Sequence, residues 1–154
     1  MEKVKIDKKS KHVKELIRSM LYVLDSIGVP LDTVGDKTKV RIAEAVLAVA
    51  SIKKSFVEAK SSDDKNFLTT RQIIDFENKY LEGSYSSGSY DDIRRSHLVM
   101  LTTAGYVVNS SQLDKQSTNN PKRGYAASPV FAELLRRYGT LEWENTLRDF
   151  KQKK

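Results

Sequence analysis

Apolar side chains recur at three- and four-residue spacing along the first half of this chain, which is the pattern of amphipathic helices. One such run covers residues 11–27, and Gly28 and Pro30 end it. A second covers about residues 36–52 with a broad apolar face, and a third starts at residue 69 or 70 and ends near Leu81. The first half of the chain is therefore expected to be helical.

A fourth helix is predicted over residues 89–104. Ser89 is a suitable N-cap, and Asp92 three residues later takes the place of the acidic member of a capping box. The arrangement leaves Arg94 and Arg95 facing outward. The apolar face is expected to be formed by Tyr90, Ile93, His97, Met100, Leu101 and Ala104.

The pattern then changes to that of a β-hairpin. Residues 106–108 and 124–127 have strand character, and the long polar loop between them ends in a basic tip at Lys122 and Arg123. A Ser-Pro pair at 128–129 is typical of a helix start, because serine caps the helix and proline is favoured at its first position. Two short helices are expected to complete the chain.

A helix followed by a hairpin with a basic tip is the order of a winged helix-turn-helix. The predicted fold class is therefore mainly α with a small β-hairpin, a winged helix-turn-helix with an N-terminal helical extension. We expect a basic tail over residues 1–12 and a single winged-helix-like domain over residues 13–150. Within the domain, an N-terminal helical part, the helix-turn-helix with its wing, and C-terminal helices are expected over about residues 13–60, 68–128 and 129–150.

The net charge of +7 is concentrated at the two ends of the 154-residue chain. Residues 1–14 hold six lysines and two acidic residues, and three lysines follow residue 150. The body between the two ends is therefore near neutral. Basic ends favour any polyanion without selecting one, and they are equally typical of solvated tails.

The chain has no cysteine, which excludes disulfides, thiolate zinc sites and cysteine nucleophiles. Its apolar runs are shorter than the ~20 residues of a membrane span. The first lysines are not followed by the apolar run of a signal peptide. We therefore expect no membrane partner and a cytoplasmic location.

The order of elements points to DNA as the partner. In helix-turn-helix proteins the first turn of the second helix meets base edges in the major groove. Arginine can bind guanine through two hydrogen bonds, whereas serine hydroxyls and helix N-termini suit phosphates. The wing would contact the flanking backbone or minor groove of double-stranded DNA. The expected DNA-binding residues are Thr70, Arg71, Ser86, Ser87, Ser89, Tyr90, Arg94, Arg95, Lys122 and Arg123.

Two acidic residues, Asp91 and Asp92, oppose this interpretation because they repel phosphate. Three other roles are open to them. They can interact with the positive end of the helix dipole, Asp91 can pair with Arg95 one turn later, or either can accept a hydrogen bond from a cytosine amino group.

Several segments share one further feature, and they are LTTRQIIDF at residues 68–76, SSGSYDDIRR at residues 86–95, Ala104-Gly105, RGYA with Ser-Pro over residues 123–129, and Gly139 with Trp143-Glu144. Together they look like the N-terminal helix-turn-helix domain of the BsuBI/PstI family of type II restriction endonucleases. The likeness covers about residues 40–144. One departure is Ser96-His97, where the family pattern continues with a charged pair, and it puts in doubt a contact from that turn.

The resemblance implies that this domain helps to recognise DNA. It also implies that a separate C-terminal domain of the Mg²⁺-dependent PD-(D/E)xK type cuts the DNA. The chain ends at Lys154, where that domain would begin, so the chain alone is expected to be non-catalytic. No cofactor is expected for this chain, and Mg²⁺ is expected only for the missing catalytic domain.

Nuclease chemistry within the chain itself has one candidate. Asp32 followed by Glu58-Ala59-Lys60 imitates the acid and acid-x-lysine spacing that holds Mg²⁺ and an attacking water. Both flanks are predicted to be helix or turn rather than paired strands, which argues against it. His12 and His97 are far apart and make no zinc site, and His97 is expected to be a core residue. No catalytic and no metal-binding residue is therefore predicted.

Three classes of function remain open from the sequence. The first is a DNA-binding module without catalytic activity. The second is a non-catalytic subunit of a split restriction endonuclease, whose nuclease domain is supplied by a partner chain. The third is a winged-helix regulator or protein-interaction module of a restriction-modification or defence system. A second copy of the chain is a further candidate partner.

Overall fold

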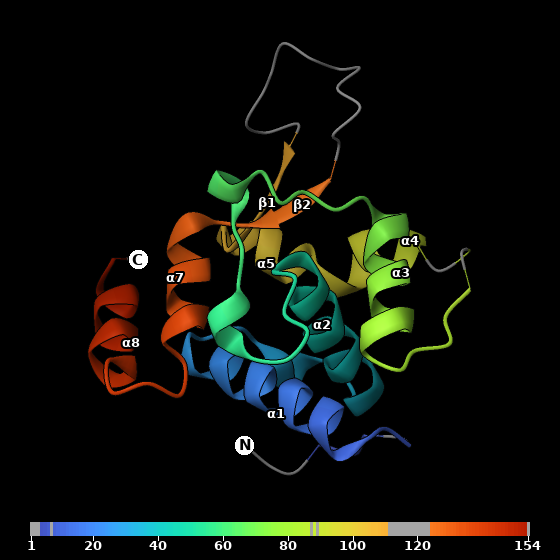
Figure 1. The fold of residues 1–154 in the computed structure, drawn as a ribbon, viewed down its shortest axis with the longest axis horizontal. Coiled ribbons are helices and arrows are strands. Elements are labelled where there is room, and N and C mark those ends of the chain that lie inside the picture. The colour runs from blue at the N-terminus through green and yellow to red at the C-terminus, as the bar shows by residue number, and fades with distance from the viewer. Residues whose placement is uncertain (1–3, 7, 87, 89, 111–123, 154) are drawn as a thin grey trace.

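The computed structural model describes residues 4–6, 8–86, 88, 90–110 and 124–153, with Tyr90 described by its backbone alone (Figure 1). The elements are α1 (Lys11–Ser26), η1 (Leu31–Thr33), α2 (Asp36–Val49), η2 (Phe56–Glu58), η3 (Ser62–Asp64), α3 (Thr70–Tyr80), α4 (Tyr90–Asp92), the π-helical turn η5 (Ile93–His97), α5 (Val99–Ala104), β1 (Val107–Asn109), β2 (Tyr125–Ala127), α7 (Pro129–Arg137) and α8 (Trp143–Gln152).

Helix α2 forms the centre of the core. From Ile42 to Ala50 every side chain is buried, which is the property of a helix surrounded by other elements. It contacts α1, α3, η5 and β2. Because α2 contacts both the N-terminal helix and the helix-turn-helix region, it fixes the position of one relative to the other.

The hairpin is joined to the helices by an isolated β-bridge at Leu68. Strands β1 and β2 are antiparallel, with Val108 opposite Ala126. Leu68, just before α3, pairs with Tyr125 through N–H···O bonds in both directions, of 2.9 and 2.7 Å. Gly124 lies so close to Leu68 that an added Cβ atom would be 2.5 Å from its backbone carbonyl. Only glycine fits at this point of contact.

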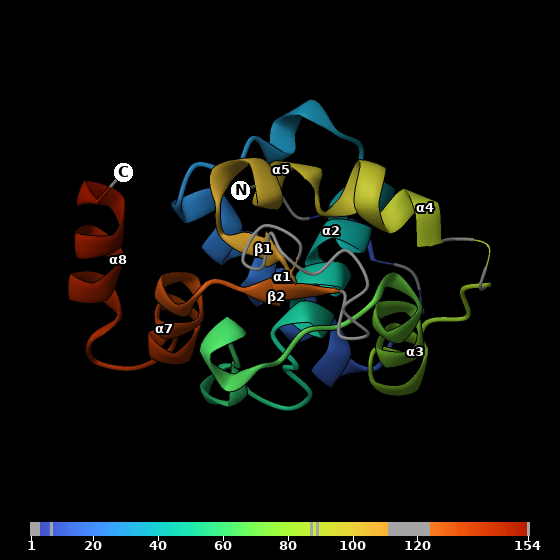
Figure 2. The same ribbon diagram turned by 90° about the horizontal axis from the view of Figure 1, so that it is seen from above.

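The order of elements is that of a winged helix-turn-helix. Helix α2, the Leu68 bridge, α3, the α4–α5 segment and the β1–β2 hairpin follow one another along the chain. Viewed from above, the α4–α5 segment lies on one side of the hairpin and α3 on the other (Figure 2). The predicted fold class, mainly helical with a small antiparallel hairpin, is confirmed.

The prediction of one continuous helix over residues 89–104 was wrong. The described part of this segment consists of α4, the π turn η5 and α5, and the Leu98 N–H donates to the Ile93 carbonyl at 2.9 Å. The wide turn adds one residue, so the buried face moves from Ile93 and His97 to Leu98 and Leu101. Ala104, expected in the core, is consequently exposed.

The described residues of the lysine-rich start pack on the domain instead of forming a solvated tail. Val4 and Ile6 are buried. Arg18 of α1 donates to the Val4 carbonyl at 3.0 Å, and the Lys5 N–H donates to Asp36 at 3.2 Å. Two buried apolar side chains and two hydrogen bonds therefore hold this segment against α1 and α2.

The C-terminal helices follow the predicted start. The Ser128 hydroxyl accepts the Phe131 N–H at 3.1 Å, with Pro129 at the first helical position. The last helix starts at Trp143, and the buried Trp143 ring packs edge-on against Tyr138. Among the described residues, no helix is long and apolar enough to cross a membrane.

Replacing Gly124 with alanine is expected to destabilise the domain by about 2 kcal/mol, because the new methyl group would push the hairpin away from Leu68. Chemical denaturation followed by circular dichroism measures this change. Gly35→Ala is the control, since an added Cβ atom there meets nothing within 4 Å and the backbone has φ −76°. Equal stability of the two variants would contradict the close contact between Gly124 and Leu68.

Candidate nucleic-acid interface

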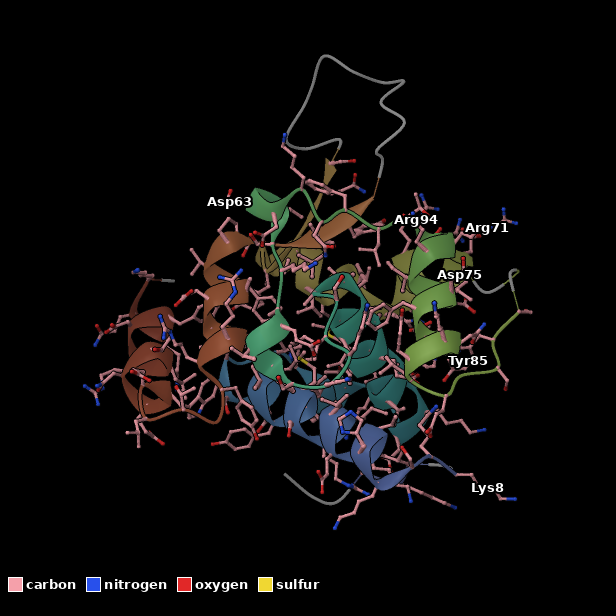
Figure 3. The ribbon with its side chains drawn as sticks, viewed as in Figure 1. Lys8, Asp63, Arg71, Asp75, Tyr85 and Arg94 are labelled. Atoms are coloured by element: carbon pink, nitrogen blue, oxygen red, sulfur yellow. The ribbon has the colours of Figure 1, made fainter. Side chains whose placement is uncertain are left out.

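The first helix of the helix-turn-helix motif has a well-capped N-terminus. The Thr69 hydroxyl accepts the Gln72 N–H at 3.2 Å, and the Gln72 side chain accepts the Thr69 N–H at 2.9 Å. This capping box fixes the start of α3. Thr70 is half-buried and Arg71 is exposed. Arg71 projects toward the upper right of the view in Figure 3, at the N-terminal end of α3.

An asparagine stabilises the turn that follows α3. The Asn78 side chain donates to the Tyr85 carbonyl and accepts the Tyr85 N–H, both at 2.9 Å. Glu82 has a left-handed backbone with φ 58°. At Gly83 a Cβ atom would lie 2.7 Å from the Tyr85 ring. Turn residues 81–85 therefore have one closely determined conformation.

Beneath this turn lies a buried charge cluster, formed by Lys9, Arg41, Glu44, Glu77 and Tyr85. The Glu44 side chain is fully buried, and its carboxylate accepts the Tyr85 hydroxyl at 2.7 Å and pairs with Lys9 at 3.2 Å. The Arg41 guanidinium lies 3.5 Å from the centre of the Tyr85 ring and 3.8 Å from Glu44. The cluster joins the N-terminal segment, α2, α3 and the turn.

Burial shifts the pKa values of two titratable groups, Glu77 of the cluster and His97 of η5. Loss of solvent, and then the nearby charge of Glu44, raise the pKa of Glu77 to about 8. Arg41 lies 3.9 Å from the Glu77 carboxylate, and its positive charge lowers the pKa of Glu77 by less than these two effects raise it. For His97 of η5, burial and then the charge of Arg41 lower the pKa to about 4. His97 is therefore an uncharged core residue at neutral pH, as the sequence predicted.

The second helix presents three polar residues in succession. Ile93 and His97 are buried, while Arg94, Arg95 and Ser96 between them are exposed. The sequence analysis offered Arg95 as the partner of Asp91, but Asp91 pairs with Arg94, at 3.5 Å. Arg95 forms no ion pair with any residue that the structure describes. Arg94 also projects toward the upper right of Figure 3.

Several predicted contact residues lie outside the described part of the chain. They are Ser87, Ser89, Lys122 and Arg123, together with the side chain of Tyr90. Ser86 is described and exposed. The structure therefore places Thr70 and Arg71 at the start of α3, and Arg94 and Arg95 on the exposed side of the α4–α5 segment. It leaves the predicted wing contacts untested.

Two exposed residues on the same segment were not predicted. Ser96 directly follows the arginines, and Val99 is exposed over 43% of its surface at the start of α5. Apolar side chains in a major groove can contact the thymine methyl group. The sequence analysis left Val99 outside the apolar face but did not consider an apolar side chain as a DNA contact.

Asp32 and Glu58, the two acids of the nuclease-like spacing, lie outside any strand in this structure. Asp32 lies in η1 and Glu58 in η2. The Glu58 carboxylate accepts the backbone N–H groups of Lys53, Lys54 and Ser55. Burial raises its pKa, but these donors outweigh that effect and lower it below the ordinary value. Within the described residues no group of three or more acidic, histidine or cysteine side chains could hold a metal ion.

Glu77 is expected to make the stability of the folded protein depend on pH. Between about pH 5 and pH 8 the folded state retains a proton that the unfolded state has lost, so the free energy of unfolding falls as pH rises. Below pH 6.5 the unfolded state binds a proton at His97 that the folded state does not bind, so this residue makes the free energy of unfolding rise with pH. We therefore expect the free energy of unfolding to fall by about 1–2 kcal/mol between pH 6.5 and 8, and not to fall in Glu77→Gln.

Urea denaturation at a series of pH values measures this effect. Glu144→Gln is the matched control, because it makes the same substitution at an exposed position of α8. The control should retain the decline of the original protein. A decline of the same size in Glu77→Gln would show that another group is responsible.

Comparison with known proteins agrees with this geometry. The solved structure of the SdaI restriction endonuclease is similar, with a TM-score of 0.71 and 27% sequence identity over 89% of this chain. This chain covers 41% of the SdaI chain. The comparison with curated proteins found no match. The family model described as the BsuBI/PstI restriction endonuclease HTH domain matches residues 14–154, and the chain belongs to that family.

Proposed function

We propose that this domain binds double-stranded DNA and recognises a specific sequence. The observation that supports the proposal most directly is the position of Arg94 and Arg95. Both are exposed on the second helix of a winged helix-turn-helix whose family and structural relative are restriction endonucleases. In this motif the second helix enters the major groove.

Arg94 and Arg95 are suited to base contacts because, among the described residues, their one ion pair is the exposed pair of Arg94 with Asp91. The pair between Arg94 and Asp91 is exposed, with more than half of each side chain accessible, so DNA can replace it at little cost. Arg95 forms no ion pair with the described residues and can reach guanine with both donors of its planar end. Asp91 remains available to the cytosine amino group of the same base pair.

Other predicted residues would set the position of the protein on the duplex. Thr70 and Arg71 at the start of α3, and the serines of the turn before α4, suit phosphate contacts. Lys122 and Arg123 of the wing would bind the flanking backbone or minor groove. Such contacts contribute affinity at every sequence, whereas the arginines of the second helix would provide the discrimination.

The chain belongs to a family of restriction endonuclease domains, and we infer a restriction endonuclease as the context of this DNA-binding role. Cleavage in that context would need a Mg²⁺-dependent catalytic domain or a partner chain. Of the two candidate carboxylates in this chain, Asp32 lies in η1 and Glu58 accepts three backbone N–H groups, and the described residues hold no group of three or more side chains that could bind a metal ion.

Replacing Arg95 with alanine is expected to cost about 1–3 kcal/mol on the preferred site and little on random duplexes. Arg94→Ala should behave similarly if Arg94 leaves Asp91 on binding. Lys122→Ala and Arg123→Ala should instead weaken binding to all sequences alike and reduce the salt dependence. Arg148→Ala is the control, since Arg148 is an exposed arginine of α8.

The measurement is fluorescence anisotropy on a duplex selected from a random pool, compared with unselected duplexes across a salt series. If selection returns no preferred sequence, the assignment of a sequence-reading helix is wrong. Failure to bind any duplex at low salt would overturn DNA binding itself.

This chain alone is expected to leave plasmid DNA intact in the presence of Mg²⁺ or Mn²⁺. Gel electrophoresis of supercoiled plasmid after incubation detects both nicks and breaks. Cleavage that disappears in Glu58→Ala and persists in Glu144→Ala would show that the Asp32 and Glu58 motif is a true nuclease site.

A further inference from the structure

An open pocket of about 400 Å³ lies between the N-terminal segment, the start of α2 and the turn after α3. Its lining includes five basic side chains and one acidic one, Glu82. The Glu82 carboxylate already accepts the Ser10 N–H at 2.6 Å. The basic side chains are Lys5, Lys8, Lys9, Lys37 and Arg41.

The basic residues of the pocket divide into two groups. Lys9 and Arg41, which are 9% and 21% exposed, belong to the buried charge cluster and share the negative charge of Glu44. Lys9 also donates to the Leu81 and Glu82 carbonyls, at 2.8 and 3.1 Å. These two residues therefore have structural partners and form the inner wall.

Lys5, Lys8 and Lys37 are different, because none of them forms an ion pair with a described residue. All three are exposed. Lys37 lies in the first turn of α2, where the helix dipole adds positive potential. The nearest acid of that turn, Asp36, already accepts the Lys5 N–H. Three ammonium groups around one cavity repel one another until an anion occupies it.

We propose that this pocket binds a phosphoryl group. A phosphate has several oxygens that can accept from different lysines at once, which suits three flexible donors from two separate segments. Two sources of the group are compatible with the pocket. One is the backbone of DNA outside the bases read by the second helix, which rests on the proposed function. The other is a free phosphorylated molecule.

The position of the pocket favours the flanking backbone. Lys8 lies at the lower right of the view in Figure 3, whereas Arg71 and Arg94 lie at the upper right. Helix α3, with 11 residues, is about 16 Å long and separates its capped N-terminus from the turn that borders the pocket. A duplex that covers only the recognition site would therefore leave the pocket empty.

Occupation of the pocket would also act on the helix-turn-helix motif. Turn residues 82–85 form one wall, and the Tyr85 ring lies on Arg41 beside Glu44. A bound anion adds negative charge next to Lys9 and Arg41, which contact this turn. The pocket is therefore placed to stabilise the orientation of α3 relative to the α4–α5 segment.

The test uses two triple variants with the same change of charge. Lys5→Gln/Lys8→Gln/Lys37→Gln removes the three unpaired lysines of the pocket. Lys11→Gln/Lys54→Gln/Lys151→Gln removes three exposed lysines that do not line it. None of the six side chains is buried, so both variants should fold, which circular dichroism verifies.

The first arm measures DNA binding on the selected site, in a short duplex and in one extended by a helical turn on each side. On the extended duplex the pocket variant should lose about one to three units of the slope of log K against log salt. On the short duplex it should match the control variant. This result identifies the flanking backbone as the source.

The second arm measures thermal stability in inorganic phosphate and in pyrophosphate, with chloride at equal ionic strength as the reference. Stabilisation of the original protein and of the control, but not of the pocket variant, supports a phosphoryl site without any DNA. This arm remains informative if the domain binds no DNA. If the two variants behave alike in both arms, the proposal is overturned.

Discussion

The Glu44 carboxylate is the charge on which the arrangement of this domain depends. It is fully buried, and a buried carboxylate without partners would cost several kcal/mol. Its partners come from three places in the sequence: Lys9 from the N-terminal segment, Arg41 from its own helix, and Tyr85 from the turn after α3. Removing any one of these partners leaves the buried Glu44 carboxylate with less compensation of its charge. The packing of the three segments is therefore interdependent.

This constraint separates a fixed framework from an adaptable surface. Turn residues 81–85 are held by Asn78, Gly83 and the buried charge cluster, which fixes how the chain leaves α3. In contrast, Arg94 and Arg95 are exposed and weakly paired. In the proposed complex with DNA, the ordered turn reduces the conformational entropy that the backbone loses on binding, and the remaining cost lies in a few exposed side chains.

The sequence was sufficient to predict the elements whose signals are local. Ser128 with Pro129 was predicted to start a helix, and this cap is present. The start of α3, predicted at residue 69 or 70, is likewise fixed by a local cap, which Thr69 forms with Gln72. The hairpin strands were likewise predicted. The π turn was not, because nothing at Ile93 to Leu98 distinguishes a wide turn from a regular one before the packing of Leu98 is known. One added residue was enough to exchange the buried and exposed positions that follow.

The charged residues show a second limit of the sequence. Glu44 lies within an apolar run of α2, which could have signalled burial, whereas Glu77 is followed by Asn78 and Lys79. Apart from Arg41, the partners of Glu44 are distant along the chain. The sequence analysis offered a polyanion contact or a solvated tail for the whole N-terminal segment and did not separate Lys9 from Lys8. The structure distinguishes them, since Lys9 is inside the buried charge cluster and Lys8 is exposed.

Net charge alone therefore says little about which residues can bind DNA. Lys9 and Arg41 neutralise buried acids, and Arg136 and Arg137 pair with Glu133 on the surface of α7. Arg95, on the second helix, forms no ion pair with a residue that the structure describes. Ion pairing, and not the net charge of the body, therefore separates the cations with structural partners from those without a described partner.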